Sequence, residues 1–544
     1  MEKSNIRRIR ITAALFAVTA FLLAVRLFYV QVICHDELKS AAVVQYEIPV
    51  IGLDTRGMIM DRNSMPLTGG TKDCYYLIRK EKEDGELRRL MTENGARRVD
   101  TDSPDYLVYR TESRDEELGK LIEERYEAYI FETSSRYRGR QIACHLIGYI
   151  NEDQGRGVSG LELMCEDRLT DDGSRLTIWA DVAGNILRGL SPVTGKEYEE
   201  SSAAQNDVME ERGVVTTIDR RLQYVCEESL ADETGSGAAL VMDGDTGQIL
   251  AWASLPVFDP NNVEDYLGEE GDCLINKVSQ AAYAPGSVFK IVTAAAALES
   301  GVCGTDFKFT CEGETTVHGI TMTCVTADGK GHGEIDMEEA MAVSCNCYFA
   351  RLGEMTGVET ILQTAEKMGL GQKVLDDFPE EAAGNLPSED ETGDWDTANI
   401  SIGQGQLTAT PLQIAAMTSV IAEGGVLKSP YVVMDDADDP ENTKGKRIIR
   451  EETARAIEKM LASVMKDGTG SGNRPLPVWG KTGTAQIGDY DDKKSNCWFT
   501  GYCRCGGRTY VITVVAENGV SGASTALPVF EKITGYIHRF GETS

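Results

Sequence analysis

The stretch AAYAPGSVFKIVTAAAALE, residues Ala281–Glu299, decides how this sequence is interpreted. Pro285 and Gly286 break the chain, and Ser287 then opens a run that is predicted to be helical because it is rich in Ala, Val, Ile and Leu. A helix that is apolar nearly all round is usually buried, yet Lys290 lies inside it. A buried ammonium is costly unless it is paired or neutralised, so this lysine needs a chemical reason to be there.

A serine and a lysine three residues apart can form a nucleophile and its base. Residues at this spacing share one face of a helix, which brings the Lys290 amine within hydrogen-bond reach of the Ser287 hydroxyl. The hydroxyl becomes a good nucleophile only when a base removes its proton, and a lysine serves when burial and a neighbouring cation lower its pKa. The positive helix N-terminus also favours an oxyanion. Alone, the pattern is common, and an ordinary surface lysine is the alternative.

Composition excludes one class of function. The chain has 544 residues, of which 42% are apolar, and a net charge of −33. The length allows two or three domains with full cores. The excess of acidic residues argues against a nucleic-acid partner, since phosphate binding requires a basic surface.

Residues 11–33 are predicted to form one transmembrane anchor. Ile11–Val25 carry no charge, Arg26 interrupts, and apolar residues continue to Ile33. At about 1.5 Å per residue this segment spans roughly 35 Å, enough for a bilayer. Basic residues precede it, so residues 1–10 are expected in the cytoplasm and the remainder outside. A cleaved signal peptide is the alternative, disfavoured because no small-x-small cleavage site follows directly.

The rest of the chain is expected to form two domains. Residues 34–200, with a charge-dense part that suggests solvated amphipathic helices, form the first domain, 201–213 a polar linker and 214–544 the second domain. The second shows hairpin patterns around Asp243–Gly247 and at Gly506-Gly507, helical patterns between them and a closing helix. This predicts an α+β fold in which helices pack on one antiparallel sheet.

The fourteen cysteines give no clear disulfide or metal pattern. A domain of this size needs no disulfides for stability, although Cys311 and Cys324 flank a short excursion and are placed to pair. Cys345-x-Cys347 and Cys503-x-Cys505 lack the usual C-x-x-C zinc spacing. We therefore expect mostly free or core thiols, no metal site and no cofactor.

Two more motifs accompany Ser287 and Lys290. AVSCNCYF contains Ser344-x-Asn346, and WGKTGTAQ contains Lys481-Thr482-Gly483. The three elements, in this order, are the signature of penicillin-binding proteins and serine β-lactamases. The joint occurrence of all three motifs is far more specific than the S-x-x-K pattern alone.

The chain resembles a class B penicillin-binding protein, the monofunctional peptidoglycan D,D-transpeptidase family. RGMIMDRN (Arg56–Asn63), HLIGYI and GVSGLE resemble segments of that family's N-terminal pedestal domain, with Ser64 where the family usually has Gly. GHGEIDMEEAMAVSCNCYFARLG and SIGQGQLTATPLQIA resemble stretches of its transpeptidase domain. The resemblance implies an anchor, a small pedestal and a transpeptidase domain of the serine β-lactamase-like fold.

The resemblance also implies a reaction. Ser287 would attack the penultimate carbonyl of a peptidoglycan stem peptide ending in D-Ala-D-Ala, with Lys290 as base, and release D-Ala from an acyl-enzyme. An amine of a second stem peptide would then form the cross-link, and β-lactams would trap Ser287. Ser344 would relay a proton to the leaving amine, and Asn346 would hold Lys290 and the substrate.

The K-T-G segment is expected to bind the substrate. Lys481 would provide a positive charge near Lys290 and, with the hydroxyls of Thr482 and Thr484, bind the terminal carboxylate. Gly483 lies between them, and the backbone N–H groups of Ser287 and Thr484 would form the oxyanion hole. The family's usual partner, a SEDS-type glycosyltransferase, would be contacted through the anchor and pedestal.

Other classes of function are compatible with parts of this pattern. A D,D-carboxypeptidase or β-lactamase would use the same motifs but let water deacylate the serine. A membrane β-lactam sensor would be acylated without turnover, and an inactive scaffold is disfavoured by the intact motifs. A Ser-His-Asp hydrolase needs a histidine near the nucleophile, but none lies in a matching motif, and His332 is expected to brace its loop.

Overall fold

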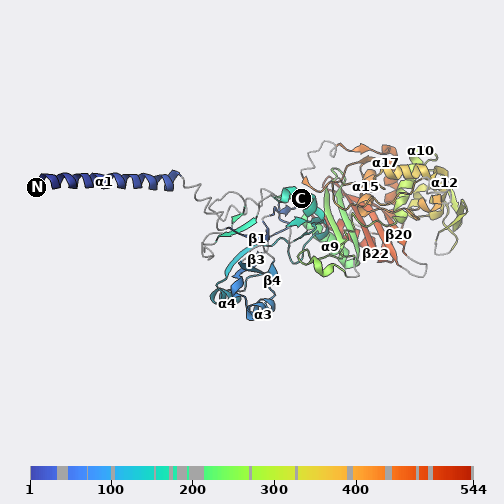
Figure 1. The fold of residues 1–544 in the computed structure, drawn as a ribbon. Helices are drawn as coiled ribbons and strands as arrows, with labels where there is room; N and C mark the ends of the chain where they lie inside the picture. Colours follow the sequence, from blue (N-terminus) through green and yellow to red (C-terminus); the bar gives the residue numbers. More distant parts are fainter. Residues whose placement is uncertain are drawn as a thin grey trace. The chain divides into compact units, whose positions relative to one another are not determined.

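The structure is a computed structural model that describes residues 2–33, 47–54, 56–69, 72–99, 105–151, 155–170, 175–179, 193–194, 213–268, 272–324, 329–375, 377–388, 396–434, 444–472, 477–487 and 494–540. Contacts divide the chain into two compact units (Figure 1). The first comprises Met1–Thr55, Lys72–Ser134 and Asp172–Val208, and the second Arg56–Thr71, Ser135–Asp171 and Met209–Ser544. The predicted linker, apart from Gly213, lies outside the described residues.

The N-terminal segment is one long helix. Helix α1 spans Glu2–Phe28 and continues as a π-helical turn, η1, over Tyr29–Ile33. Its stretch Ile11–Gln31 has a mean hydropathy of 2.2, and none of its most apolar window is buried against the protein. The helix is therefore long and apolar enough to cross a membrane, as the sequence predicted.

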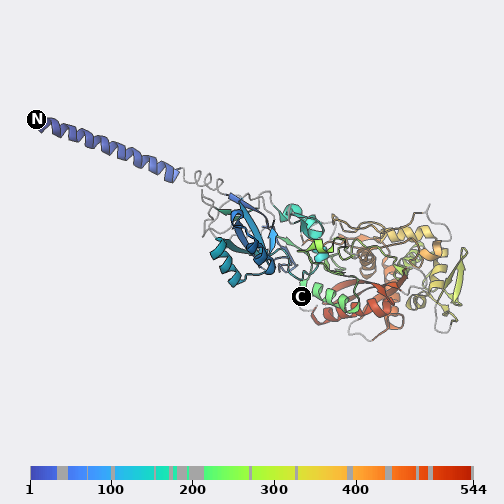
Figure 2. The same cartoon turned by 60° about the horizontal axis from the view of Figure 1, so that its bottom comes forward.

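The rest of the first unit is built on a four-stranded antiparallel sheet in the order β4-β5-β3-β6. Alternate residues of β3 point to opposite faces, so Tyr76 packs with Leu87 of α3 and Ile122 of α4, whereas Tyr75 stacks on Phe131 across the other face. Figure 2 shows both helices on one side of this sheet. The bounds are β3 Lys72–Arg79, α3 Gly85–Glu93, β4 Arg97–Val99, β5 Tyr106–Thr111, α4 Glu116–Tyr126 and β6 Tyr129–Ser134. A second, three-stranded sheet contains β1 Glu47–Asp54, β9 Arg175–Trp179 and β10 Val193–Thr194.

The second unit contains a five-stranded antiparallel sheet in the order β13-β12-β22-β21-β20. Both predicted hairpins are confirmed, since β12 joins β13 around Asp243–Gly247 and β21 joins β22 at Gly506-Gly507. The strand bounds are β12 Gly237–Asp243, β13 Ile249–Leu255, β20 Val478–Gln486, β21 Ser495–Cys505 and β22 Arg508–Gly519.

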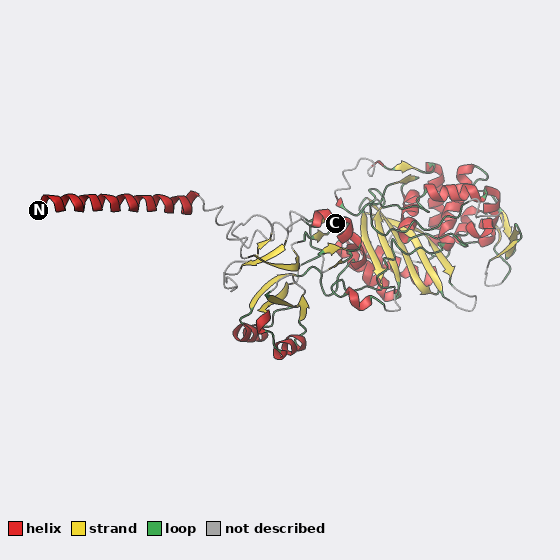
Figure 3. Ribbon diagram, viewed as in Figure 1, coloured by secondary structure: helices red, strands yellow, loops and turns green. Residues whose placement is uncertain are grey.

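Helices cover both faces of this sheet, as Figure 3 shows in red against yellow strands. Consecutive residues of a strand point to opposite faces. In β21, Phe499 packs on Phe530 of α18, with ring centroids 4.4 Å apart, while the Thr500 hydroxyl lies 2.6 Å from that of Thr418 in α15. The antiparallel, helix-packed α+β fold is thus confirmed. The helix bounds are α9 Arg220–Glu233, α15 Pro411–Ala422, α17 Glu451–Lys466 and α18 Leu527–Phe540.

Two segments from the N-terminal half of the sequence fold with the second unit. Strand β2 (Ile59–Met60) pairs in parallel with β11 (Val214–Val215). The buried Arg56 guanidinium lies 2.7 Å from the Glu162 carboxylate, joining RGMIMDRN to GVSGLE, and Arg136 binds the same carboxylate at 2.6 Å. The ion cluster joins residues 56–71 to residues 135–171. The pairing of β2 with β11 and the hydrogen bond from the Ala143 N–H to the Glu227 carboxylate of α9 tie these segments to the rest of the second unit, although the sequence boundaries place them in the first domain.

The remaining helices of the second unit carry two of the three motifs. A 3₁₀ turn, η4 (Gly286–Phe289), contains Ser287, and the α-helix α10 begins at Lys290 and ends at Ser300, so the predicted helix starts as a tighter turn. Ser344 lies between α11 (Met337–Ala342) and α12 (Asn346–Thr356), with α13 (Val358–Lys367) following. Beside them lie two hairpin-like pairs, β14 (Phe309–Cys311) with β17 (Gly333–Ile335) and β15 (Glu314–Val317) with β16 (Ile320–Thr323).

Candidate active site

The Lys290 amine is the centre of the site. Its side chain is fully buried in the first turn of α10. The Nζ atom donates hydrogen bonds to the Ser344 carbonyl oxygen at 2.8 Å, the Ser344 hydroxyl at 3.2 Å and the Asn346 Oδ1 at 2.7 Å. The first two motifs, far apart in sequence, are therefore joined through this one amine.

Lys481 brings in the third motif. It lies fully buried in β20, and its Nζ donates to the Ser344 hydroxyl at 2.9 Å. The Ser344 hydroxyl thus lies between two lysine amines. Ser344 has a φ of 57°, a left-handed conformation that is uncommon outside glycine, and this turn directs both its carbonyl and its hydroxyl to Lys290.

Both amines are electrostatically destabilised as ammonium ions. Burial lowers the pKa of Lys290 from 10.5 to about 8. Burial also lowers the pKa of Lys481, well below its usual value, and the charge of nearby Lys290 lowers it further. In the described part of the chain, the hydrogen bonds of these amines go to hydroxyl, amide and carbonyl oxygens and none to a carboxylate. The pair therefore gives up a proton far more readily than surface lysines do.

Strand β20 lies against the turn that carries Ser287, and Gly483 permits this approach. A Cβ atom at Gly483 would lie 3.0 Å from the Val288 Cγ1 atom and 3.1 Å from the Pro285 carbonyl oxygen. Both distances are shorter than ordinary van der Waals contacts. Close packing of the strand on η4 therefore explains the glycine of the K-T-G motif. The same packing brings Thr484 close to the backbone beside Ser287, since a Cβ atom at Gly286 would lie 3.1 Å from the Thr484 carbonyl oxygen.

The structure differs from the sequence expectation at the Ser287–Lys290 pair. In the described part of the chain, the hydrogen bonds of the Lys290 amine go to Ser344 and Asn346 and none to Ser287. Ser287 is half-buried, on the 3₁₀ turn that precedes the helix. Catalytic hydrogen bonds are often long before substrate binds, and the roles of Ser287 as nucleophile and Lys290 as base stay a prediction.

Several residues that the motifs did not indicate support the site. Thr469 shares a hydrogen bond of 2.7 Å with the Thr482 hydroxyl, and the backbone N–H of Gly522 donates to the Thr484 hydroxyl at 3.1 Å. Trp498, fully buried in β21, donates its indole N–H to the Ala284 carbonyl at 3.0 Å. No spacing pattern in the sequence marks Thr469 or Gly522, because each reaches the site through tertiary packing.

Comparisons with known proteins agree with this geometry. Residues 237–535 match the family model of the penicillin binding protein transpeptidase domain. Peptidoglycan D,D-transpeptidase MrdA of Acinetobacter baumannii is 27% identical over 96% of this chain and 87% of its own length, and stage V sporulation protein D of Bacillus subtilis is 28% identical over 98% and 86%.

A solved structure, described as structural coordination of polymerization and crosslinking by a peptidoglycan synthase complex, superposes with a TM-score of 0.69 at 24% identity, covering 99% of both chains. At that identity the likeness establishes the fold alone. The family model spans the sheet, both lysines and Ser344, and it covers more than half of the chain. This chain therefore belongs to the penicillin-binding protein transpeptidase family, as one of its class B members.

Proposed function

We propose that this chain is a peptidoglycan D,D-transpeptidase that cross-links stem peptides through an acyl-serine at Ser287. The observation that carries the proposal is the meeting of two buried lysine amines, with no carboxylate partner among the described residues, at the hydroxyl of Ser344. Such amines are poised to accept and pass on protons near neutral pH. The relatives named above supply the substrate class, since one bears the name of a peptidoglycan D,D-transpeptidase.

Acylation begins with attack of the Ser287 Oγ on the carbonyl carbon of the penultimate D-Ala. The hydroxyl proton passes to the neutral Nζ of Lys290, and the developing oxyanion accepts hydrogen bonds from the backbone N–H groups of Ser287 and Thr484. When the tetrahedral intermediate collapses, its C–N bond breaks. The departing D-Ala amine takes a proton from the Ser344 hydroxyl, which regains one from the adjacent lysine pair.

The K-T-G segment would bind the terminal carboxylate of the donor peptide. The Thr484 side chain is exposed, while that of Thr482 is held by Thr469. A charged Lys481 next to these hydroxyls would provide a charge-assisted site for the carboxylate. A bound carboxylate would in turn favour protonation of Lys481, so substrate binding would leave Lys290 as the neutral member of the pair.

Deacylation by an acceptor amine distinguishes this proposal from a hydrolase. The amine of a second stem peptide attacks the ester carbonyl, forms the cross-link and returns the proton to Ser287. A β-lactamase that uses a carboxylate to activate water needs that carboxylate beside the serine or its lysine. Among the described residues, none forms a hydrogen bond with Lys290 or Lys481. This favours transpeptidation over a β-lactamase of that kind. The names of the relatives favour it over a D,D-carboxypeptidase and over a non-hydrolysing β-lactam sensor.

The anchor suggests the location of the enzyme and its partner protein. The basic residues before α1 favour a cytoplasmic N-terminus and an extracytoplasmic catalytic unit. A SEDS-type glycosyltransferase, reached through the anchor and the first unit, remains the proposed partner. It would supply the glycan strands, and the solved peptidoglycan synthase complex with this fold supports such an arrangement.

Intact-mass spectrometry with a labelled penicillin tests the proposal. The full chain, purified in detergent, should gain one slowly released adduct, because β-lactams resemble the D-Ala-D-Ala end. Ser287→Ala should gain none, whereas the matched control Ser300→Ala, at the last residue of α10 and away from the motifs, should label like the wild type. Rapid release of hydrolysed drug would instead indicate a hydrolase, and the absence of any adduct on folded wild-type protein would indicate an inactive scaffold.

A further inference from the structure

A buried ion pair that the proposed reaction does not use lies at the end of strand β22. The side chain of Lys277 is 1% exposed, and its Nζ atom lies 2.8 Å from the Glu517 carboxylate, which is 17% exposed. The ammonium also pairs with the Asp272 carboxylate and donates to the Ser236 hydroxyl at 2.7 Å. Ser236 in turn donates its hydroxyl proton to the Oε2 atom of Glu517. These contacts engage one oxygen of the Glu517 carboxylate.

The other oxygen of Glu517 binds Tyr283, which precedes the turn η4 that carries the proposed nucleophile. The Tyr283 hydroxyl donates to the Glu517 Oε1 atom at 2.8 Å, and the tyrosine side chain is buried. Burial raises the pKa of this hydroxyl, and the adjacent carboxylate raises it further, so the hydroxyl keeps its proton. A hydrogen bond to an ionised acceptor is stronger than one between neutral groups. Tyr283 is therefore firmly attached to the end of β22.

The backbone between Tyr283 and η4 is held at both of its ends. The Tyr283 N–H donates to the Ala409 carbonyl at 3.0 Å, and the Ala409 N–H donates back to the Tyr283 carbonyl at 2.9 Å. The Tyr283 ring packs edge-on against Trp498, with ring centroids 5.9 Å apart. At the other end, the Gly286 N–H donates to the Gly403 carbonyl at 2.8 Å. The position of η4 therefore depends on where the Tyr283 side chain is fixed.

The same end of β22 supports the other half of the proposed oxyanion hole. The strand ends two residues after Glu517, and the chain then turns so that the Gly522 N–H donates to the Thr484 hydroxyl at 3.1 Å. A Cβ atom at Gly522 would lie 2.4 Å from the Gly483 carbonyl oxygen, so this turn packs directly on β20. Glu517 thus lies where the support of Thr484 and the support of Ser287 meet.

We propose that Glu517 and Tyr283 are positioning residues, through which the carboxylate, held by Lys277, sets the spacing of the two N–H donors of the oxyanion hole. This role rests on the proposed function, because the donors of Ser287 and Thr484 matter only if an acyl-enzyme forms. Neither positioning residue touches the reacting atoms. Donors that are already in place lower the barrier because they need no rearrangement during the reaction, and a misplacement of about 1 Å can slow a reaction on the order of 100-fold.

A purely structural role is the alternative, since removing one partner of a buried ion pair destabilises a protein. Two conservative variants separate the roles. Tyr283→Phe removes only the hydroxyl and leaves the pair of Lys277 and Glu517 in place. Glu517→Gln removes the negative charge beside Lys277 but keeps a hydrogen bond to Tyr283, because an amide and a tyrosine hydroxyl can each donate or accept.

The test measures acylation of the full chain, purified in detergent, at several concentrations of a fluorescent penicillin. This separates the affinity of the initial complex from the acylation rate constant. Tyr283→Phe should lower the rate constant about tenfold, with an initial affinity and an unfolding temperature close to those of the matched control. The control is Tyr510→Phe, which also removes the hydroxyl of a buried tyrosine, on β22 itself.

Glu517→Gln should show the opposite pattern, with a lower unfolding temperature and an acylation rate constant close to that of the wild type. Rate constants that follow the unfolding temperatures in every variant would overturn the positioning role and leave a structural one. If Glu517→Gln does not fold, Tyr283→Phe alone decides, because a rate constant equal to that of Tyr510→Phe would also overturn it.

Hydrogen exchange tests the attachment of Tyr283 without any substrate. In mass spectrometry, the peptide containing the Gly286 N–H should exchange about tenfold faster in Tyr283→Phe than in the wild type, and Tyr510→Phe should leave it unchanged. Faster exchange in a protein that penicillin never labels would establish the attachment and refute the proposed function alone. Unchanged exchange would overturn the attachment, and an unchanged acylation rate constant would overturn the positioning role.

Discussion

The pH dependence of acylation gives the sharpest test of the lysine pair. Burial lowers the pKa of Lys290 from 10.5 to about 8. The base must be neutral to accept the Ser287 proton, so the acylation rate should rise with pH and level off above the pKa. At pH 7 about a tenth of the molecules have a neutral base, and at pH 9 about nine-tenths do, so the rate should rise about tenfold between them.

The assay is the second-order rate constant for labelling of the full chain by a fluorescent penicillin from pH 6 to 10. Drug hydrolysis, measured in parallel without protein, corrects for the alkaline end. Because Lys481 is coupled to Lys290 through the Ser344 hydroxyl, the observed midpoint belongs to the pair rather than to either amine. We expect one midpoint near pH 8.

Two results would refute this reasoning. A rate that continues to climb beyond pH 10 would mean that burial does not lower the lysine pKa. A rate that is flat from pH 6 to 9 would mean that a group other than these amines takes the proton. Lys290→Arg is the matched variant, since its guanidinium stays charged throughout, and it should label very slowly at every pH.

Three substitutions extend the test to the support of the site. Gly483→Ala would place a methyl group 3.0 Å from Val288, so it should destabilise the fold by about 1–3 kcal/mol in thermal unfolding and slow penicillin labelling; normal labelling would argue against the tight packing of β20 on η4. Glu162→Gln removes the buried carboxylate that Arg56 and Arg136 share, leaving Arg56 its ion pair with Glu166, and should lower the free energy of unfolding by about 3–5 kcal/mol in denaturant titration, while an unchanged midpoint would mean that the ion cluster is dispensable. Asn346→Ala removes a 2.7 Å hydrogen bond to the catalytic amine and should slow acylation about tenfold to 100-fold with little loss of stability, a pattern that a purely structural role would reverse.

Sequence patterns were sufficient for the sheet of the second unit and for the catalytic motifs. The hairpins around Asp243–Gly247 and at Gly506-Gly507 carry local turn signals, and β12, β13, β21 and β22 formed where these predict. The motif residues Ser287, Lys290, Ser344 and Lys481 are recognisable because acyl transfer requires those residue types at fixed spacing. The hairpins were predictable because their turn signals are local in sequence, and the motifs because the chemistry restricts the residue types.

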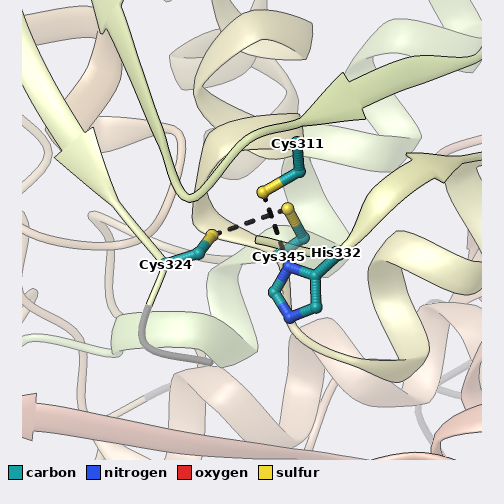
Figure 4. Close-up of side chains that lie close together, drawn as sticks. All are labelled: Cys311, Cys324, His332 and Cys345. Carbon is teal, nitrogen blue, oxygen red and sulfur yellow. Dashed lines mark hydrogen bonds between the residues drawn. The ribbon is translucent and has the colours of Figure 1, made fainter. Parts of the chain in front are cut away.

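The parts that could not be predicted depend on long-range packing. The Arg56–Glu162 pair joins segments that the sequence boundaries separate from the catalytic unit. Cys311, Cys324, His332 and Cys345 lie close together (Figure 4), which the C-x-x-C pattern does not indicate because they come from separate parts of the chain. His332, expected to brace a loop, faces Cys311 at 3.6 Å, and only the structure brings the two together.

Packing of the sheet holds the two buried lysines in place although their burial costs folding free energy. A pKa lowered from 10.5 to about 8 means that protonated Lys290 is about 3 kcal/mol less stable here than in water, so the site itself opposes folding at neutral pH. Lys481 pairs across the sheet with Thr500, whose hydroxyl is 2.6 Å from that of Thr418 and 2.8 Å from that of Thr513.

This buried chain of hydroxyls links β21 to β22 and to α15 behind the catalytic strand. On the other side of Ser344, the backbone N–H groups of Asn346 and Cys347 donate to the Cys324 sulfur at 3.2 and 3.4 Å and hold the turn. The two amines can therefore be held at one hydroxyl without a carboxylate, because neither the strand nor the turn is free to move away.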